Sequence, residues 1–305
     1  MSFSVEVDSV TKRLGKSVVL DGVSLTVDKS GCYAVLGPNG AGKTTLFRIL
    51  TTLIYPDKGK VLINGEDAFK DKEKALGNLG ALVSVPEPPD FMKVGEFIEF
   101  SAKLRGRKAK LNELNEKLDL PDLNRRCGKL SKGQKRRVFL AALIAQDPDI
   151  IVLDEPTDGL DPIEIFKVKG VIRELKRDKI ILYSSHIMSE VVDICDYVFI
   201  MNKGKIVYKS TITNLERMFR PTSLRVELEY HISIDELKAT LNGLVKSIKE
   251  DGDRRYEVEF DGNSETRQKI LKILVDNFQV RSFYDSTSSL ESAFVKVLGV
   301  FNGGS

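Results

Sequence analysis

A glycine-rich segment at residues 37–45 constrains this chain more than any other part of its sequence. It reads Gly-Pro-Asn-Gly-Ala-Gly-Lys-Thr-Thr and fits the pattern G-x-x-x-x-G-K-[ST] of a phosphate-binding loop between a strand and a helix. Glycines let the backbone curl until several N–H groups point into one concavity, and the following helix adds the positive end of its dipole. The lysine can then reach the phosphates, and the threonine hydroxyl after it can bind Mg²⁺. The residues expected at the phosphates are Gly37, Asn39, Gly40, Gly42, Lys43, Thr44 and Thr45.

The residues around this loop predict an α/β fold with a parallel sheet. Continuous apolar runs predict buried strands at 32–36, 150–153 and 180–183. Helical periodicity predicts helices at 44–50, 131–146 and 163–177. Strands that alternate with helices in this way are typical of a parallel sheet with helices on both faces.

Other segments predict additions to this sheet. Residues 3–30 alternate between apolar and polar around a turn at Gly15, which indicates an antiparallel sheet. A short strand at 59–63 ends in the turn signal Asn64-Gly65. Residues 94–117 have a helical pattern, and residues 197–208 predict a hairpin.

The length of 305 residues suggests two domains, and the composition changes near residue 221. We expect one domain at residues 1–220 and an accessory domain at 221–305. In the second domain the predicted elements follow the order β-α-β-β-α-β of a ferredoxin-like α+β fold. They lie at 223–230, 234–244, twice within 245–260, at 264–277 and at 279–284, and an amphipathic helix follows at 290–298.

Composition limits the partners of this chain. No apolar run approaches the ~20 residues that span a membrane, so any membrane role must come through another protein. The net charge of +3 does not argue for nucleic acid, and none is expected as a partner. One basic cluster is interpreted as a solvated helix face, and it comprises Lys129, Lys132, Lys135, Arg136 and Arg137.

Further polar residues follow the phosphate loop at the ends of predicted strands. An apolar strand ends in Asp154 and Glu155, and the next strand ends in Ser-Ser followed by His186. An acid at a strand tip beside a phosphate loop can hold Mg²⁺, and an adjacent acid can polarise an attacking water. Taken alone, such an acid pair could also cap a helix. Two more segments read Leu-Ser-Lys-Gly-Gln at 130–134 and Gly-Leu-Asp-Pro at 159–162.

In this order, these segments and the phosphate loop resemble the nucleotide-binding subunit of ABC transporters, over about residues 3–215. The variants at 130–134 and 159–162 look most like the stand-alone ATPase subunits of ABC-2 type exporters. The resemblance implies a P-loop ABC ATPase core with an antiparallel β subdomain and a helical subdomain. It also implies ATP and Mg²⁺ as ligands, Thr44 and Asp154 at the metal, and Glu155 and His186 as catalytic residues.

The resemblance further implies that each ATP site is shared between two subunits. Ser131, Gly133 and Gln134 would close over ATP held by the other subunit, and Asp161 would contact that subunit. The active unit would be a head-to-tail homodimer or ABC heterodimer. Local chemistry offers a second explanation, because Ser131 suits a helix N-cap and Asp161 suits a turn before a proline.

The chain departs from the family pattern at three positions. Lys132 replaces the usual glycine of the segment at 130–134. The usual glutamine after the strand at 79–83 falls on Ser84, with Glu87 as the nearest alternative. The aromatic residue that usually stacks on adenine falls on Leu14.

These features favour a Mg²⁺-dependent ATPase that powers a separate membrane permease, as an exporter, from the cytoplasmic face of the membrane. One alternative is a soluble ABC ATPase that remodels nucleic acid or ribosomes. However, residues 45–130 leave no room for a long coiled coil, and the chain has a single ATPase core. Another alternative is a nucleotide kinase, which would lack the segment at 130–134 and His186. The permease would hold the transported substrate, so this chain does not reveal it.

Overall fold

The computed structural model describes residues 3–84, 87–218 and 222–286. The chain divides into two compact units, residues 1–212 and residues 213–305. The expected boundary between residues 220 and 221 falls among residues outside the described ranges, as does the expected helix at 290–298. The exact boundary therefore stays a prediction.

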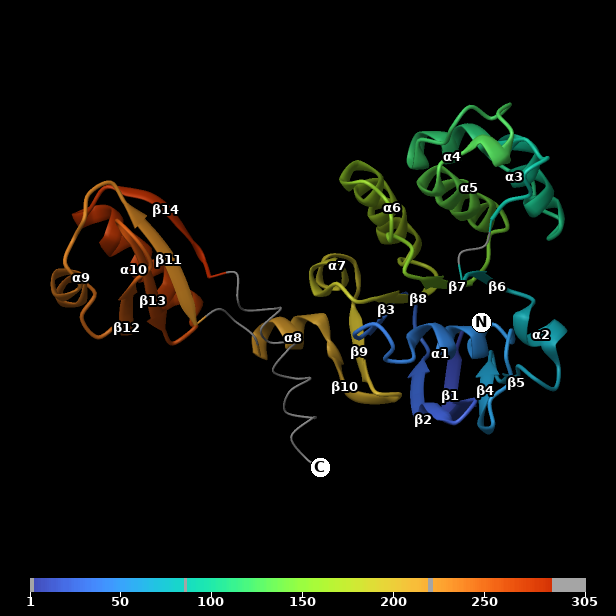
Figure 1. The fold of residues 1–305 in the computed structure, drawn as a ribbon, viewed down its shortest axis with the longest axis horizontal. Helices are drawn as coiled ribbons and strands as arrows, with labels where there is room; N and C mark the ends of the chain where they lie inside the picture. The colour runs from blue at the N-terminus through green and yellow to red at the C-terminus, as the bar shows by residue number, and fades with distance from the viewer. Residues whose placement is uncertain (1–2, 85–86, 219–221, 287–305) are drawn as a thin grey trace. The chain divides into compact units, whose positions relative to one another are not determined.

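A six-stranded sheet forms the centre of unit 1, in the order β10-β9-β3-β8-β7-β6. β3, β6, β7, β8 and β9 pair in parallel, and β10 adds an antiparallel edge. The strands are β3 (Gly31–Leu36), β6 (Leu79–Leu82), β7 (Ile150–Asp154), β8 (Ile180–Ser185), β9 (Tyr197–Asn202) and β10 (Lys205–Thr211). Every residue of β7 and β8 is buried, which explains their continuous apolar sequences. Figure 1 shows α1 (Lys43–Leu50) and α7 (Met188–Ile194) on opposite faces of this sheet, as predicted.

A second sheet of unit 1 is antiparallel, in the order β2-β1-β4-β5. Its strands are β1 (Val5–Leu14), β2 (Ser17–Val27), β4 (Lys58–Ile63) and β5 (Glu66–Asp67). The predicted Asn64-Gly65 turn connects β4 to β5, with φ angles of 53° and 81° that an Asn-Gly pair adopts readily. Phe47 of α1 shares one hydrophobic core with Val7 of this sheet and Val152 of the six-stranded sheet. The helix that follows the phosphate loop is therefore held by both sheets.

Helices α3 (Val94–Lys103), α4 (Leu111–Leu118) and α5 (Lys132–Ala145) form one group in Figure 1, and α4 also packs against α6 (Pro162–Leu175). The helical pattern predicted over 94–117 corresponds to two helices, α3 and α4, because the chain breaks at Gly106. There φ is +63°, and the N–H groups of Gly106 and Arg107 bond back to the carbonyls of Lys103 and Ala102, both at 2.9 Å. This is a Schellman ending, which glycine favours because it adopts positive φ without strain. The remaining short helices are α2 (Lys72–Leu76), the 3₁₀ turn Cys127–Lys129 and α8 (Ile212–Met218).

Unit 2 contains an antiparallel sheet in the order β12-β13-β11-β14. Its elements are β11 (Ser223–Leu228), α9 (Ile234–Thr240), β12 (Val245–Glu250), β13 (Arg255–Phe260), α10 (Ser264–Asn277) and β14 (Val280–Asp285). This is the element order predicted from the sequence, while the ferredoxin-like assignment itself stays a prediction. The core joins Leu224 and Tyr256 of the sheet to Leu237 of α9 and Ile270 of α10. Unit 2 thus has a hydrophobic core of its own.

Among the described residues, the structure contains no helix that is both long enough and apolar enough to cross a membrane.

The separate core of unit 2 generates a stability prediction on α10. Ile270 is fully buried, whereas Val275 on the same helix is 58% exposed. We expect Ile270→Ala to lower the free energy of unfolding of unit 2 by about 2–5 kcal/mol, because it leaves a cavity. Val275→Ala should change it by less than about 0.5 kcal/mol. Chemical denaturation followed by circular dichroism measures both values, and nucleotide binding by unit 1 should persist in each variant. Loss of nucleotide binding together with the unfolding of unit 2 would contradict the division into two units.

Candidate active site

The parallel register of the central sheet brings three loops together at the carboxyl ends of its strands. Leu36 at the end of β3 pairs with Ser185 of β8, and Asp154 at the end of β7 pairs with Ser184 of β8. The phosphate loop, the two acids and His186 therefore begin at neighbouring positions on one sheet edge. Ligands of open α/β sheets bind at such an edge.

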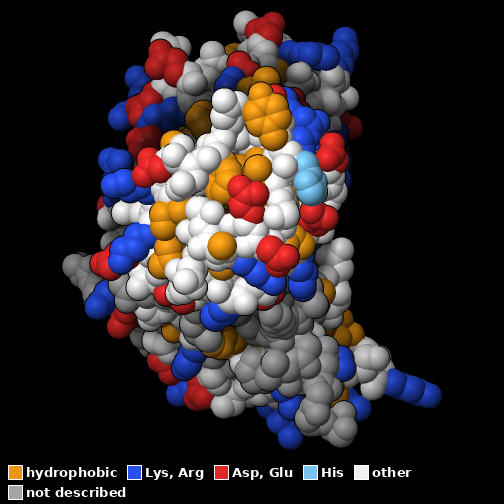
Figure 2. Space-filling model, turned by 90° about the vertical axis from the view of Figure 1, so that its left-hand side faces the viewer, with side chains coloured by type: hydrophobic (Ala, Val, Ile, Leu, Met, Phe, Trp, Pro, Cys, Tyr) orange, Lys and Arg blue, Asp and Glu red, His pale blue; other side chains and the backbone are white. Residues whose placement is uncertain are grey.

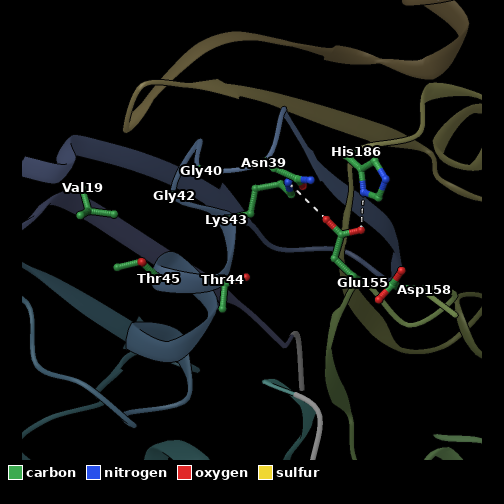
Figure 3. Close-up of a pocket in the computed structure, with 10 residues that line it drawn as sticks. All are labelled: Val19, Asn39, Gly40, Gly42, Lys43, Thr44, Thr45, Glu155, Asp158 and His186. Atoms are coloured by element: carbon green, nitrogen blue, oxygen red, sulfur yellow. Dashed lines mark hydrogen bonds and ion pairs between the residues drawn. The ribbon is translucent and has the colours of Figure 1, made fainter. Parts of the chain in front are cut away.

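These loops enclose a pocket of about 340 Å³, shown in Figure 3. It is lined by Val19, Asn39, Gly40, Gly42, Lys43, Thr44, Thr45, Glu155, Asp158 and His186. The structure thus brings together most of the predicted phosphate-loop residues with both predicted catalytic residues. Val19 and Asp158 were not predicted, because neither belongs to a motif.

The glycines of the loop are required by close backbone packing. Gly42 has a φ of +108°, and a Cβ there would lie 2.8 Å from Leu20 and 2.9 Å from the carbonyl of Val19. A Cβ on Gly37 would lie 2.3 Å from the carbonyl oxygen of Met201. Side chains at either position would displace the loop, so the pattern of glycines has a steric basis.

Lys43, Glu155 and His186 form a chain of contacts across the pocket, drawn as dashed lines in Figure 3. The Lys43 Nζ lies 3.2 Å from Glu155 Oε1 and donates to the carbonyl of Gly37 at 2.8 Å. The His186 Nδ1 lies 2.7 Å from Glu155 Oε2. One carboxylate therefore joins the cation of the phosphate loop to the imidazole on the other side of the pocket.

Asp154 is buried next to Glu155 and is held by Ser184. The Ser184 hydroxyl donates to Asp154 Oδ1 at 2.6 Å and accepts from the N–H of Glu155 at 2.9 Å. One hydroxyl therefore orients both acids. Sequence reasoning missed this role, although Ser184 stands in the Ser-Ser-His segment that it singled out.

A metal ion at this site would have few protein ligands. Among the described residues, no group of three His, Cys, Asp or Glu side chains could hold a metal ion. Asp154 is buried at the end of β7 and is not among the residues that line the pocket, but it offers a carboxylate next to Glu155, and Thr44 offers a hydroxyl in the pocket. Mg²⁺ bound with a nucleotide typically uses one or two protein oxygens and takes the rest from phosphates and water, so this donor set fits Mg²⁺.

The residues predicted for the partner's ATP do not line this pocket in the described part of the chain. Ser131 is exposed and caps α5, where its hydroxyl accepts from the N–H of Gln134 at 3.2 Å and the Gln134 side chain accepts from the N–H of Ser131 at 3.1 Å. Gly133 is buried, and a Cβ there would lie 2.9 Å from Glu164 Oε2. Asp161 caps α6 by accepting from the N–H of Glu164 at 2.8 Å. Helix capping and close packing within the chain therefore explain why these residue types occur at these positions.

A buried carboxylate supports the loops on both sides of the pocket. Oε2 of Glu190 on α7 accepts from the hydroxyls of Thr157 at 2.9 Å, Tyr183 at 3.0 Å and Ser185 at 3.2 Å. Burial and the Glu190 carboxylate raise the pKa of Tyr183 far above its usual range, so its phenol remains a donor. Thr157 follows Glu155 closely and Ser185 precedes His186, so one side chain braces both loops. A single Glu in a helix carries no motif that could have predicted this.

The interpretation of the basic cluster as a solvated face is wrong for two of its members. Arg136 and Arg137 are only 7% and 6% exposed. Arg137 donates to the carbonyl of Leu118 at 2.9 Å and pairs with Glu164 at 2.8 Å. Arg136 donates to carbonyls of residues 154–158, the acid loop. Burial lowers the pKa of Arg136, although nearby carboxylates oppose this shift. These guanidinium groups bind the protein's own backbone.

One face of the molecule carries described side chains of both charges. On the face of the molecule in Figure 2, Lys and Arg side chains are interspersed with Asp, Glu and hydrophobic side chains. The described side chains of this face therefore form no single basic area of the kind that attracts nucleic acid.

The family departures also have definite places in the structure. The Ser84 hydroxyl accepts from Arg48 Nε of α1 at 2.8 Å, and Glu87 pairs with Lys135 of α5 at 2.7 Å. Both candidates for the usual glutamine are therefore held by helices that flank the site, and the choice between them stays open. Leu14 is 47% exposed and is not among the residues that line the pocket, whereas Val19 lines it as an apolar residue.

Known proteins with similar sequences and structures are ATP-binding subunits of transporters. The family model described as ABC transporter matches residues 20–158. The bacitracin transport ATP-binding protein of Bacillus licheniformis is 33% identical over 312 aligned residues, which cover 98% of this chain and 98% of that protein. The ABC transporter ATP-binding protein NatA of Bacillus subtilis (strain 168) is 36% identical over 210 residues, covering 66% of this chain and 85% of that protein. A solved ATP binding subunit of an ABC transporter is 27% identical with a TM-score of 0.63, covering 70% of this chain and 92% of that chain.

The Glu190 network generates a prediction about stability. Glu190→Ala would leave three buried hydroxyls without their shared acceptor, and leaving one buried group unsatisfied costs about 1–3 kcal/mol. We expect the variant to lower the free energy of unfolding of unit 1 by at least that amount, measured by urea denaturation. Ser189→Ala is the control, because Ser189 is exposed on the same helix and should change stability little. Equal stability of the two variants would show that the network does not brace the loops.

Proposed function

This chain belongs to the ABC transporter family of ATP-binding subunits, and from this premise we propose that it hydrolyses ATP with Mg²⁺ to power export through a separate membrane permease. The observation that carries the proposal is the contact chain Lys43–Glu155–His186 beside the phosphate loop. It places a cation, a carboxylate and an imidazole around one pocket. Phosphoryl transfer to water needs these groups for charge stabilisation and for the orientation of the attacking water.

We assign a separate task to each residue of the site. Lys43 and the loop N–H groups bind the phosphates. Glu155 polarises the attacking water and accepts its proton. His186 contacts Glu155 through Nδ1, which fixes the orientation of its ring. The Nε2 atom of that ring is then the group that would hydrogen-bond the γ-phosphate.

Thr44 and Asp154 would hold Mg²⁺. The ion would neutralise charge on the phosphates as the terminal phosphate leaves. The Ser184 hydroxyl supports this assignment, because it fixes the Asp154 carboxylate by a hydrogen bond of 2.6 Å.

The assignment of Glu155 predicts a separation of binding from turnover. Glu155→Gln removes the proton acceptor but keeps the shape of the side chain, so turnover should fall by about 10²–10⁴-fold. ATP affinity, measured by calorimetry, should stay close to that of the unchanged protein. Lys43→Ala provides the contrast, because it should lose ATP affinity as well. A Glu155→Gln variant that hydrolyses ATP at the normal rate would remove Glu155 from the mechanism.

We also propose that the active unit is a head-to-tail dimer, as a homodimer or with another ABC subunit. Ser131 and Asp161 support this, because both are exposed at the N-termini of 14-residue helices, where free N–H groups favour anions. Gly133 lets α5 pack closely on Glu164, and Gln134 completes the cap. The same residues that end the helices locally would then face ATP on the second copy.

Shared sites predict complementation between two inactive variants. Ser131→Arg should block the helix end that reaches the partner's ATP, and Lys43→Ala should block the chain's own phosphate loop. Mixed heterodimers contain one intact site, so phosphate release should reappear when the two variants are mixed. A mixture of Ser131→Arg with the double variant Ser131→Arg/Lys43→Ala is the control, since it forms no intact site. Heterodimers that are confirmed by mass but remain inactive would exclude shared sites.

Transport is tested with the chain and its permease together in inverted membrane vesicles. The bacitracin transport relative, which matches nearly the whole length of this chain, makes bacitracin the first probe. Export predicts that ATP added outside drives bacitracin into the vesicles and that vesicles with the Glu155→Gln variant accumulate none. The alternative of a soluble ABC ATPase that remodels nucleic acid or ribosomes predicts full ATPase activity without any permease and stimulation by ribosomes or nucleic acid.

A further inference from the structure

Arg136 links the helix of the segment at 130–134 to the acid loop of the same chain. It lies on α5, five residues after Ser131, which is about 7.5 Å along the helix axis. Its guanidinium donates to the carbonyl oxygens of Asp158 at 2.7 Å, Asp154 at 3.3 Å and Glu155. A charged guanidinium bound to three carbonyls is a strong connection, because charge-assisted hydrogen bonds are about twice as strong as neutral ones.

The backbone of Glu155 needs such a connection. Its φ of 48° lies in the left-handed region, which costs a non-glycine residue free energy and persists only where surrounding groups hold it. Its N–H is held by the Ser184 hydroxyl at 2.9 Å, and its carbonyl accepts from Arg136 and from the N–H of Asp158 at 3.2 Å. Arg136 is therefore one of three groups that hold the Glu155 backbone, and it is the one that connects this backbone to α5.

We propose that Arg136 is a positioning residue that couples the two ATP sites of the dimer through Glu155. This inference rests on the proposed head-to-tail dimer. In that dimer, the Ser131 end of α5 faces ATP on the partner, whereas Glu155 faces ATP on its own loop. A shift of α5 on ATP binding at one site is passed by Arg136 to the backbone of Glu155 at the other site.

An arginine that only stabilises the fold should affect hydrolysis differently from Arg136. Arg105 is the arginine chosen for this comparison. Arg105 also donates to three carbonyls, those of Leu76, Gly77 and Leu79. Leu76 ends α2, Gly77 follows it and Leu79 begins β6, so none of the three lies in the acid loop. Both arginines should contribute to stability, but only Arg136 should contribute to the position of Glu155.

The test compares Arg136→Gln with Arg105→Gln in steady-state ATP hydrolysis. We expect Arg136→Gln to lower kcat by between about tenfold and a hundredfold, the loss that follows from a misplacement of about 1 Å. KM for ATP should stay within about threefold, since the phosphate loop is untouched. The Hill coefficient for ATP should fall toward one, and Arg136→Lys, which keeps the charge, should recover part of kcat. Arg105→Gln should lower the melting temperature without changing kcat or the Hill coefficient.

A double variant shows whether Arg136 acts through Glu155. In the Glu155→Gln background, single-turnover hydrolysis should not fall further when Arg136→Gln is added, because coupled residues are not additive. Full additivity, or an Arg136→Gln variant that loses only stability, overturns the proposal. If Arg136→Gln does not fold, Arg136→Lys is compared in the same way. A normal rate for Glu155→Gln or failed complementation would instead overturn the proposed function.

Discussion

The parallel pairing of β3, β7 and β8 is the constraint on which the rest of the site depends. It places Leu36, Asp154 and Ser184–Ser185 at matching positions, so the loops that follow them share one edge of the sheet. The phosphate loop would bind anions poorly if α1 could move, and α1 is fixed because the two sheets of unit 1 pack around it in one core. The positions of the site residues at this edge therefore depend on the buried strands that lead to it.

Several polar residues of the site first satisfy the protein's own backbone. Ser131 and Asp161 cap helices, Ser184 binds the Glu155 N–H, and Arg136 binds carbonyls of the acid loop. Such bonds are needed wherever backbone groups are buried at helix ends and strand ends. A residue that serves the backbone and also faces a ligand links the local fold to the state of the site. In the proposed dimer Ser131 and Asp161 would have both tasks, so their local contacts alone do not decide their roles.

Much of this arrangement was predictable from the sequence because it rests on local patterns. The apolar runs, the glycine spacing at 37–45 and the turn at Asn64-Gly65 each predict one local geometry, and the structure agrees. The contacts of Arg136 and Glu190 were not predictable. Arg136 binds carbonyls 18 to 22 residues away, and Glu190 joins hydroxyls near it in sequence to that of Thr157, 33 residues away. The break at Gly106 between α3 and α4 was not predicted either, because the spacing of apolar side chains does not show where the backbone adopts a positive φ.

Several elements of unit 1 set the position of Glu155. Its carboxylate contacts Lys43 of α1 and His186 beyond β8, while its backbone is held by Ser184 of β8 and Arg136 of α5. The φ of Glu155 is unfavourable, so relaxation of this backbone lowers the free energy when one of the groups that hold it moves away. The rate of hydrolysis would then depend on the arrangement of these elements as much as on the residues themselves. In the proposed dimer, the rate of hydrolysis at one site could be controlled in this way by the second subunit, without any change in the chemistry of the site.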